Sequence, residues 1–544
     1  MPSFQRLKAW LSLENIAAIL VIIFGLLLRL RQLTLNLSFW LDEAMLALNI
    51  VNRTFDGLVR PLDYNQGAPL GFLWTVKTAE VLLGNRELSL RLFPFLMGCL
   101  SLIVLWLLAR QLIKPVGVIF ALLIFASSRY LVSYGAEVKQ YAVDAAVTLL
   151  LYLLGLSLLR KTATKKDYFL LAILGGLSIW MSHPAVFTLG GIGLTLIVSA
   201  ALKKDWKGAL GYGLASAFWA LNFAALYLIQ YRGLAANDYL TGFWAEYFMP
   251  LTFSAPAWTL DRLGGLFYNP GGMSVDVPAA LILVLFLAGV GSLVQRKMHW
   301  VWMFVLSLVF TLAASSLGKY PFGGRMGMFA VPGLLICAGE GVELVRRLFG
   351  RLSLSSSSRP LQGAATEQTK DSGSPGSWTA GQQPHRLLAF TPTLDLVVSL
   401  ALVGYLTFTP LSFAVELALK PKMAENIAPT MAYLKTNYHQ GDVIYLYRVS
   451  IPAFRYYAPK YGLDSASIVT GSDFHGNMES YCTEVKQLAG NQRVWLLFSH
   501  LTDYEYLNER DAILKCASQV GSKKREFSEP GTMINLFLYD LATH

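Results

Sequence analysis

Two adjacent carboxylates, Asp42 and Glu43, follow the first long apolar stretch of the sequence. Charged side chains beside a membrane segment are costly to place and usually serve a function. A carboxylate in this position could accept a proton from an attacking hydroxyl group. The alternative is structural, because acidic residues also favour the first turn of a helix. The pair therefore predicts either chemistry at a membrane surface or the start of a helix.

Further acids, bases and hydrogen-bonding groups lie in loops that we expect on the same side of the membrane. They are Asp63, Gln66 and Lys77 in the first such loop, Glu137, Lys139 and Tyr141 in the second with Asp144 just after it, His183 at the start of the sixth span, and Lys319, Tyr320 and Arg325 before the tenth. Cations can hold a lipid-linked phosphate while a carboxylate accepts a proton. The set would therefore suit a reaction on such a phosphate.

Several of these groups also have a purely structural explanation. Glu137 and Lys139 could pair with each other, and Arg325 could extend toward lipid headgroups. His183 precedes a proline and could be a buried histidine with satisfied hydrogen bonds. These alternatives stay open at the level of the sequence.

The composition is that of a membrane protein. Of 544 residues, 54% are hydrophobic and only 15% are charged, with a mean hydropathy of +0.47. Soluble domains carry about 25% charged residues. The net charge of +11 does not call for nucleic acid, because much of it sits in short loops between apolar stretches. We expect membrane lipids as partners and no nucleic acid.

Apolar stretches long enough to cross a bilayer recur along the chain, about eleven in number. The first is a span and not a cleavable signal peptide, because it is long and lacks a small-residue cleavage site. The approximate ranges are 14–34, 90–110, 115–133, 142–159, 167–182, 185–202, 208–229, 277–295, 300–316, 326–346 and 387–409. The sequence thus predicts an α-helical polytopic membrane protein.

Loop charges assign a side to every predicted span. Arg and Lys gather in alternate loops, and such basic loops remain in the cytoplasm. The basic loops lie near residues 6–8, 110–114, 160–166, 203–207, 296–297 and 346–351. The extracytoplasmic segments are then 35–89, 134–141, 183–184, 230–276, 317–325 and 410–544. All of the candidate residues above fall on this second side.

The chain divides into four parts, namely a membrane module (1–350), a linker (351–386), a last transmembrane helix (387–416) and an extracytoplasmic domain (417–544). The linker is rich in Ser, Gly and Pro and lacks apolar periodicity, which predicts disorder on the cytoplasmic side.

Apolar runs indicate secondary structure outside the spans. In the last part, buried strands are predicted at 443–447, 494–498 and 534–539, and helices at 425–437 and 504–520, which together indicate a small α/β domain. In the first extracytoplasmic loop, residues 44–51 and 70–83 predict amphipathic helices that lie in the membrane interface.

Cysteines and metal-ligand patterns are less informative. Cys482 and Cys516 could form a disulfide in an oxidising compartment or remain two buried thiols. Cys99 and Cys337 fall within spans and indicate packing. Carboxylate pairs without His or Cys spacing are weak evidence for a metal. The sequence establishes no cofactor and leaves a divalent metal ion open.

Residues 41–44, Leu-Asp-Glu-Ala, resemble the acidic motif of membrane glycosyltransferases with the GT-C fold. The similar branch holds the protein O-mannosyltransferases, the aminoarabinose transferases and the bacterial lipopolysaccharide-core glycosyltransferases. Further matches follow in family order at residues 66–70, 91–94, 137–141, 182–184 and 320–325. The resemblance covers about residues 10–345 and does not extend to the C-terminal domain.

The resemblance implies an enzyme of the bacterial inner membrane with its active site on the extracytoplasmic side. Such enzymes take a sugar from a polyprenyl-phosphate carrier and pass it, with inversion, to a hydroxyl group of a glycan, lipid or protein. Asp42 matches the catalytic carboxylate, which would accept the hydroxyl proton as the oxygen attacks the anomeric carbon. Glu43 and Glu137 would orient hydroxyl groups of the acceptor or the sugar.

The same resemblance implies where the phosphate is held. Lys139 and Arg325, with Tyr141 or Tyr320 as further donors, would receive the phosphate as it leaves. One departure concerns the lysine that precedes paired prolines in some relatives, since residues 67–69 read Gly-Ala-Pro here. Lys77 could substitute for that lysine from the following turns.

Two other classes of protein fit parts of the pattern. A transporter or flippase of a lipid-linked or anionic substrate could line its path with the same charged residues. It would be expected to show inverted repeats, which the sequence lacks. A non-catalytic assembly protein would instead bind a partner through the C-terminal domain, and Asp42 and Arg325 would be dispensable.

Overall fold

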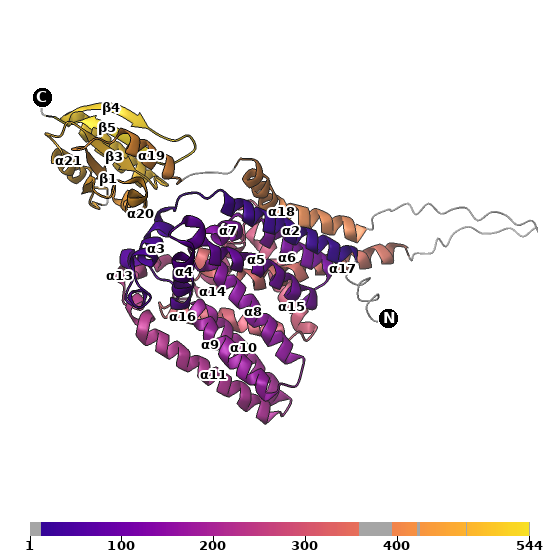
Figure 1. Ribbon diagram of the computed structural model, residues 1–544. Coiled ribbons are helices and arrows are strands. Elements are labelled where there is room, and N and C mark those ends of the chain that lie inside the picture. The colour runs from indigo at the N-terminus through magenta and orange to yellow at the C-terminus, as the bar shows by residue number, and fades with distance from the viewer. Residues whose placement is uncertain (1–11, 358–393, 421–424, 475, 543–544) are drawn as a thin grey trace, which may run out of the picture.

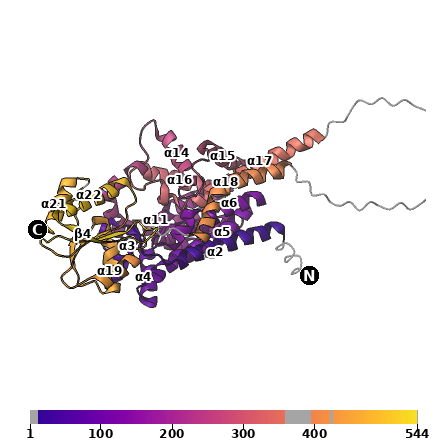
Figure 2. The same ribbon diagram turned by 90° about the horizontal axis from the view of Figure 1, so that it is seen from above.

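The computed structural model describes residues 12–357, 394–420, 425–474 and 476–542. A large helical module is followed by a smaller domain built on one sheet, and the two lie side by side (Figure 1). Seen from above, the sheet domain and the far end of helix α17 (Val331–Ser357) lie at opposite ends of the molecule (Figure 2). Most of the predicted linker, 351–386, lies outside the described residues.

A helix stands at each position where the sequence predicts a span. These helices are α2 (Leu13–Thr34), α5 (Glu87–Leu112), α6 (Pro115–Ser127), α8 (Tyr141–Leu159), α9 (Lys165–Met181), α10 (Ala185–Leu202), α11 (Trp206–Leu226), α15 (Ala279–Gln295), α16 (Trp300–Ser316), α17 and α18 (Leu394–Leu419). Within the described ranges, 6 helices are long and apolar enough to cross a membrane, or 7 if one bent pair counts as a span. A multi-pass membrane protein is confirmed, whereas the count of eleven spans stays a prediction.

Large apolar side chains cover the outside of the helical module. Leu20, Leu221 and Phe408 are among many that are exposed on helices of this module. A soluble protein rarely exposes such an extended apolar surface, whereas lipid tails accept it at no cost. The helices therefore present a lipid-facing surface and keep their polar groups inside.

The bent pair consists of α6 and α7 (Arg129–Ser133), which meet at an angle of 58°. At the break, the buried guanidinium of Arg29 on α2 donates to the carbonyls of Phe125 and Ala126 over 3.0 and 3.2 Å. These bonds satisfy carbonyl groups at the end of α6 that would otherwise lack a partner. The bend, followed by the 3-10 turn η3 (Tyr134–Ala136), directs the chain into the loop that carries Glu137 and Lys139.

Short helices occupy the segments that we expect outside the membrane or continue the ends of the spans, since the candidate span that begins with α11 runs to Leu234. They are α3 (Leu41–Asn52), η1 (Gly57–Val59), η2 (Asp63–Asn65), α4 (Leu70–Leu83), the π-helical turn η4 (Tyr227–Tyr231), α12 (Arg232–Ala235), α13 (Asp238–Phe243), η5 (Ala245–Tyr247), α14 (Ala255–Tyr268) and η6 (Gly324–Gly327). Helices α3 and α4 confirm the two helices predicted in the first loop. Helix α3 is buried over most of its length, and α20 (Ile451–Tyr461) of the C-terminal domain packs on it. Its expected position in the membrane interface stays a prediction.

The C-terminal domain is a mixed sheet covered by helices. Strands β1 (Val443–Leu446), β2 (Ser467–Thr470), β3 (Val494–Phe498), β4 (Ser522–Phe527) and β5 (Asn535–Asp540) are arranged in the order β2-β1-β3-β5-β4. The first three strands are parallel, and β5 is antiparallel to both β3 and β4. The helices are α19 (Ala428–Asn437), α20 (Ile451–Tyr461), α21 (Met478–Lys486) and α22 (Tyr504–Val520), with the short turn η7 (Arg448–Ser450).

The predictions for this domain hold where strands are buried. Strands β1, β3 and β5 confirm the three predicted strands, and α19 and α22 the two helices. Strands β2 and β4 were not predicted, because they lie at the two edges of the sheet and their residues are mostly exposed. A disulfide joins Cys482 to Cys516 and so ties α21 to α22.

Candidate active site

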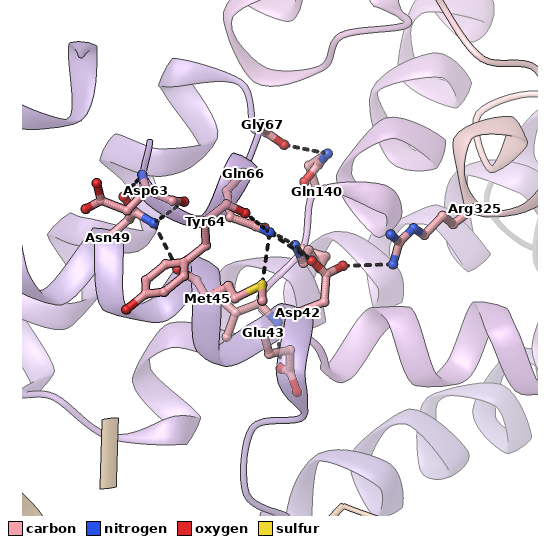
Figure 3. A network of polar contacts seen from close by, with 12 residues as sticks. Asp42, Glu43, Met45, Asn49, Asp63, Tyr64, Gln66, Gly67, Gln140 and Arg325 are labelled. Atoms are coloured by element: carbon pink, nitrogen blue, oxygen red, sulfur yellow. Dashed lines mark hydrogen bonds and ion pairs between the residues drawn. The ribbon is translucent and has the colours of Figure 1, made fainter. Parts of the chain in front are cut away.

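Asp42 lies in the first turn of α3 and is held by three side chains from three other segments (Figure 3). Its Oδ1 is 2.9 Å from Nζ of Lys139, and its Oδ2 is 2.8 Å from Nη1 of Arg325. The amide of Gln66 donates to Oδ1 over 3.1 Å. Asp42 does not cap its own helix, because α3 has no side-chain cap. Asp42 and Glu43 do lie in the first turn of α3, as the helix-start explanation expects, but Asp42 does not act as the N-cap.

The two cations also control the charge of the carboxylate. Burial acts to raise the pKa of Asp42, but Lys139 and Arg325 overcome this effect and lower the pKa to about 2. Burial lowers the pKa of Lys139, although the charge of Asp42 opposes that shift. Two cations thus face one carboxylate, which leaves an excess of positive charge beside Asp42.

Lys139 and Gln66 are fixed to each other as well as to Asp42. The ammonium of Lys139 donates to Oε1 of Gln66 over 2.7 Å, and Lys139 is only 3% exposed. Because Gln66 precedes Gly67, this contact also places the glycine beside Gln140, whose amide donates to the Gly67 carbonyl over 3.4 Å. The predicted Gln66 and Lys139 are therefore parts of one hydrogen-bonded cluster around Asp42.

Glu43 points to a different set of groups. Its two carboxylate oxygens accept from Nε and Nη2 of Arg91 over 2.9 and 2.7 Å, and Oε1 also accepts from the backbone N–H of Val138. Both side chains of this pair are buried. Glu43 thus ties α3 to α5 and to the loop of Lys139. Arg91, which lies in a motif quoted for the resemblance, was not predicted as a site residue, although an arginine near the start of an apolar helix is a usable signal.

Glu137 lies partly buried near the cluster, with its Oε2 atom fully buried. Burial, reinforced by the charge of Glu43, raises the pKa of its carboxyl to about 8. Among the described residues, its Oε2 has no hydrogen-bond partner. The raised pKa favours the neutral carboxyl. In the part of the chain that the structure describes, Glu137 forms no ion pair with Lys139, whose carboxylate partner is Asp42.

The loop before α17 brings Arg325 to Asp42 through a glycine turn. Gly323 and Gly324 both have positive φ angles, of 150° and 49°, and a Cβ atom on Gly323 would lie 2.7 Å from the ring of Tyr247. The hydroxyl of Tyr320 donates to the carbonyl of Met326 over 3.0 Å and closes the loop. The guanidinium of Arg325 lies over the rings of Tyr141 and Trp244, at 5.7 and 5.4 Å from their centroids.

A cavity of about 440 Å³ opens next to this cluster. Three of its lining residues, Gly67, Gln140 and Met326, are sequence neighbours of Gln66, Lys139 and Arg325. The remaining lining is mainly apolar and aromatic, with His183, Tyr320 and Lys319 as further polar groups. The other lining residues are Val186, Phe187, Phe223, Tyr227, Tyr231, Leu234, Leu240, Thr241, Trp244, Phe248, Ala314, Gly318 and Pro321.

His183 and Tyr320 therefore reach the cavity and not Asp42. The ring of His183 packs edge-on against Tyr231 at a centroid distance of 5.0 Å, and burial lowers its pKa to about 4, so the imidazole is neutral at physiological pH. Its Nε2 has no partner among the described residues. The ring of Tyr320 packs against Phe187. Both side chains can offer hydrogen bonds or ring faces to a molecule in the cavity.

Comparisons with known proteins bear on the fold that carries this cluster. Residues 67–228 match a family model described as dolichyl-phosphate-mannose-protein mannosyltransferase. ArnT from Cupriavidus metallidurans, bound to undecaprenyl phosphate, has a similar structure over 98% of both chains, with a TM-score of 0.51 and 14% identity. The protein has the fold of the GT-C glycosyltransferases. The resemblance expected from the sequence is thus confirmed.

Two further structures match this chain at TM-scores below 0.5. Apo ArnT from the same organism gives a TM-score of 0.49 at 14% identity over 98% of both chains. The oligosaccharyltransferase of Archaeoglobus fulgidus, in complex with zinc and sulfate, gives 0.45 at 10% identity over 96% of this chain and 73% of its own. No curated protein matches by sequence. The family match includes Lys139 and His183 and excludes Asp42 and Arg325.

Within this GT-C fold, Lys77 does not reach the cluster. Its ammonium pairs with Glu80 at 2.9 Å and donates to the carbonyl of Val51 over 3.2 Å. Lys77 therefore does not take the place of the lysine that some relatives have near the phosphate. Its side chain extends from α4 toward α3 and does not line the cavity. Lys319 lines the cavity. The sequence places it in the same loop as Arg325 but does not assign it a role.

No group of three or more His, Cys, Asp or Glu side chains within the described ranges could hold a metal ion. Asp42 and Glu43 cannot share a cation in this arrangement, because each is already paired with a basic side chain. A divalent metal ion therefore remains an open possibility, as it was from the sequence alone.

Proposed function

We propose that the protein is an inverting glycosyltransferase that moves a sugar from a polyprenyl-phosphate carrier to an acceptor hydroxyl on a glycan, lipid or protein. One observation carries the proposal: a partly buried carboxylate, Asp42, lies between two cations beside an apolar cavity in a lipid-facing fold. A general base, a phosphate-binding charge and a site for a lipid are thus adjacent.

The cavity supports the choice of carrier. Its volume of about 440 Å³ and its apolar and aromatic lining suit the first prenyl units of a lipid, together with the group attached to its phosphate. A related structure, that of ArnT, is described as bound to undecaprenyl phosphate. We assign the same class of carrier to this protein.

The excess cation supports the handling of phosphate. Arg325 uses one guanidinium nitrogen on Asp42 and retains other N–H groups, which can donate to a phosphate oxygen. Lys139 is more buried and serves mainly to hold Asp42 and Gln66. In this assignment Arg325 links the base to the leaving group.

The transfer step follows from these positions. The acceptor oxygen forms a bond to the anomeric carbon, the bond from that carbon to the phosphate oxygen breaks, and the hydroxyl proton passes to Asp42. The electron pair of the broken bond leaves on the phosphate, whose charge Arg325 stabilises. A phosphate that draws Arg325 toward itself also weakens the interaction that lowers the pKa of Asp42, so donor binding makes the carboxylate a stronger base.

The orientation of the protein is part of the proposal. The charge asymmetry of the loops supports an extracytoplasmic position for the cluster and the C-terminal domain, and the family resemblance supports a bacterial inner membrane. The Cys482–Cys516 disulfide supports that side, because disulfides persist in oxidising compartments.

Replacement of Asp42 by Asn tests the function. The purified protein in lipid is given a panel of polyprenyl-phosphate sugars together with hydroxyl acceptors of the three classes, glycan, lipid and protein, and release of polyprenyl phosphate is measured. We expect the wild type to release it with at least one donor. Asp42→Asn should bind the donor and lose on the order of 10²–10⁴ in rate. Equal rates for both proteins would reject the mechanism and leave the transporter as the better explanation.

A further inference from the structure

The start of helix α3 lacks a cap of its own. Trp40 occupies the N-cap position, and no side chain within the local segment accepts a hydrogen bond from the first turn. The first N–H groups of a helix have no partner inside the helix, and a buried end needs one from elsewhere. In this protein the partner comes from the C-terminal domain.

Glu425 of that domain supplies the missing acceptor. Its Oε2 accepts from the backbone N–H of Leu41 over 3.2 Å, and its Oε1 lies 2.9 Å from Nδ1 of His500. The ring of His500 stacks on that of Trp40, with centroids 6.2 Å apart. A carboxylate at a helix N-terminus also interacts favourably with the helix dipole. Glu425 thus acts as a cap from about 380 residues further along the chain.

Other side chains of the same domain hold the residues just before α3. Asn426 accepts from both the backbone N–H and the hydroxyl of Ser38, over 3.2 and 2.8 Å. The hydroxyl of Tyr457 accepts from the backbone N–H of Phe39 over 2.9 Å. Phe39 is fully buried against the ring of Tyr456. The C-terminal domain therefore binds residues 38, 39 and 41, and Asp42 follows directly.

We propose that Glu425 is a positioning residue for sugar transfer, because it fixes the first turn of α3 and with it the carboxylate of Asp42. The inference rests on the proposed function for its consequence and on the contacts above for its geometry. A base must be held to within about 0.5 Å of its working position, and a misplacement of about 1 Å can cost 10²-fold in rate. The C-terminal domain would thus be part of the catalytic unit.

Two substitutions of Glu425 distinguish the effect of losing the hydrogen-bond acceptor from the effect of losing the negative charge. Glu425→Gln keeps an oxygen that can accept from Leu41, whereas Glu425→Ala removes the acceptor. We expect Glu425→Ala to lower the maximal transfer rate about tenfold or more with unchanged donor affinity. Glu425→Gln should stay within about threefold of the wild type. The matched control is Glu479→Ala, which removes an exposed carboxylate from α21 of the same domain.

Hydrogen–deuterium exchange gives a readout that does not need activity. In Glu425→Ala, a peptide covering residues 38–44 should exchange faster than in the wild type, while the peptide covering β3 should remain unchanged. A Glu425→Ala protein with wild-type exchange at 38–44, or with wild-type transfer, would overturn the inference. If the wild type transferred no sugar, the proposed function would fail, and the exchange result would still decide the capping role.

Discussion

Lys319 differs from Lys139 and Arg325 in having no ion pair with a carboxylate among the described residues. It lines the cavity at the end of α16, after the left-handed Gly318. A cation without a competing carboxylate is well suited to a phosphate. We expect Lys319→Gln to weaken binding of undecaprenyl phosphate about tenfold, measured by titration of the protein in detergent.

The control for this substitution is Lys77→Gln. Lys77 is a lysine of the same expected side that pairs with Glu80, so its loss should leave the affinity for the lipid phosphate unchanged. Lys319→Arg should retain most of the affinity, because it keeps the charge. If Lys319→Gln and the wild type bound undecaprenyl phosphate equally well, Lys319 would not contact the phosphate, and Arg325 would be its remaining candidate cation.

Glu137 gives the site a pH dependence in stability. Because the folded protein raises the pKa of this carboxyl to about 8, the folded state retains a proton that the unfolded chain has already lost above pH 4.5. Stability contributed by this group is therefore full below pH 4.5 and decreases as the pH rises toward 8. In Glu137→Gln, the loss of unfolding free energy between pH 5 and pH 8 should be smaller than in the wild type by at least about 1 kcal/mol. Thermal unfolding of both proteins at pH 5 and pH 8 measures the difference, and identical pH profiles would contradict the assignment.

At the scale of elements, the bend between α6 and α7 decides where the loop of Lys139 lies. Arg29 holds that bend through the carbonyls of Phe125 and Ala126. Arg29→Leu leaves both carbonyls buried without a donor, and each such group costs about 1–3 kcal/mol. We therefore expect a clearly lower unfolding temperature and weaker transfer. The control is Arg160, which is exposed in a basic loop. Arg160→Leu should change neither the unfolding temperature nor the transfer rate strongly.

The whole molecule has a predicted orientation that single cysteines can test. In a background without Cys99, a cysteine at Glu479 should react with an impermeant thiol reagent on intact cells, and one at Thr162 should react only after the membrane is opened. Both positions are exposed. The reason is the charge asymmetry of the loops. Labelling of Thr162→Cys on intact cells would reverse the orientation and place Asp42 on the cytoplasmic side.

The sequence was most informative where a pattern is local. Apolar stretches predicted the helices because burial in lipid or protein depends mainly on composition, and the same holds for the buried strands β1, β3 and β5. The edge strands β2 and β4 were missed because exposed strands need no apolar pattern. Asp42 was found because an acidic pair beside an apolar helix is rare, and Arg325 because it follows a Gly-Gly turn.

Which groups meet was decided only by the tertiary structure. Adjacent in sequence, Asp42 and Glu43 point to different partners because successive helix positions face about 100° apart, so one joins Lys139 and Arg325 and the other Arg91. Lys77 pairs with Glu80, and Lys319 reaches the cavity instead. The cap from Glu425 crosses about 380 residues and leaves no local signal. The sequence by itself therefore determined a membrane-embedded, GT-C-like chain with an acidic motif, whereas the partners of each charge depend on packing between distant segments.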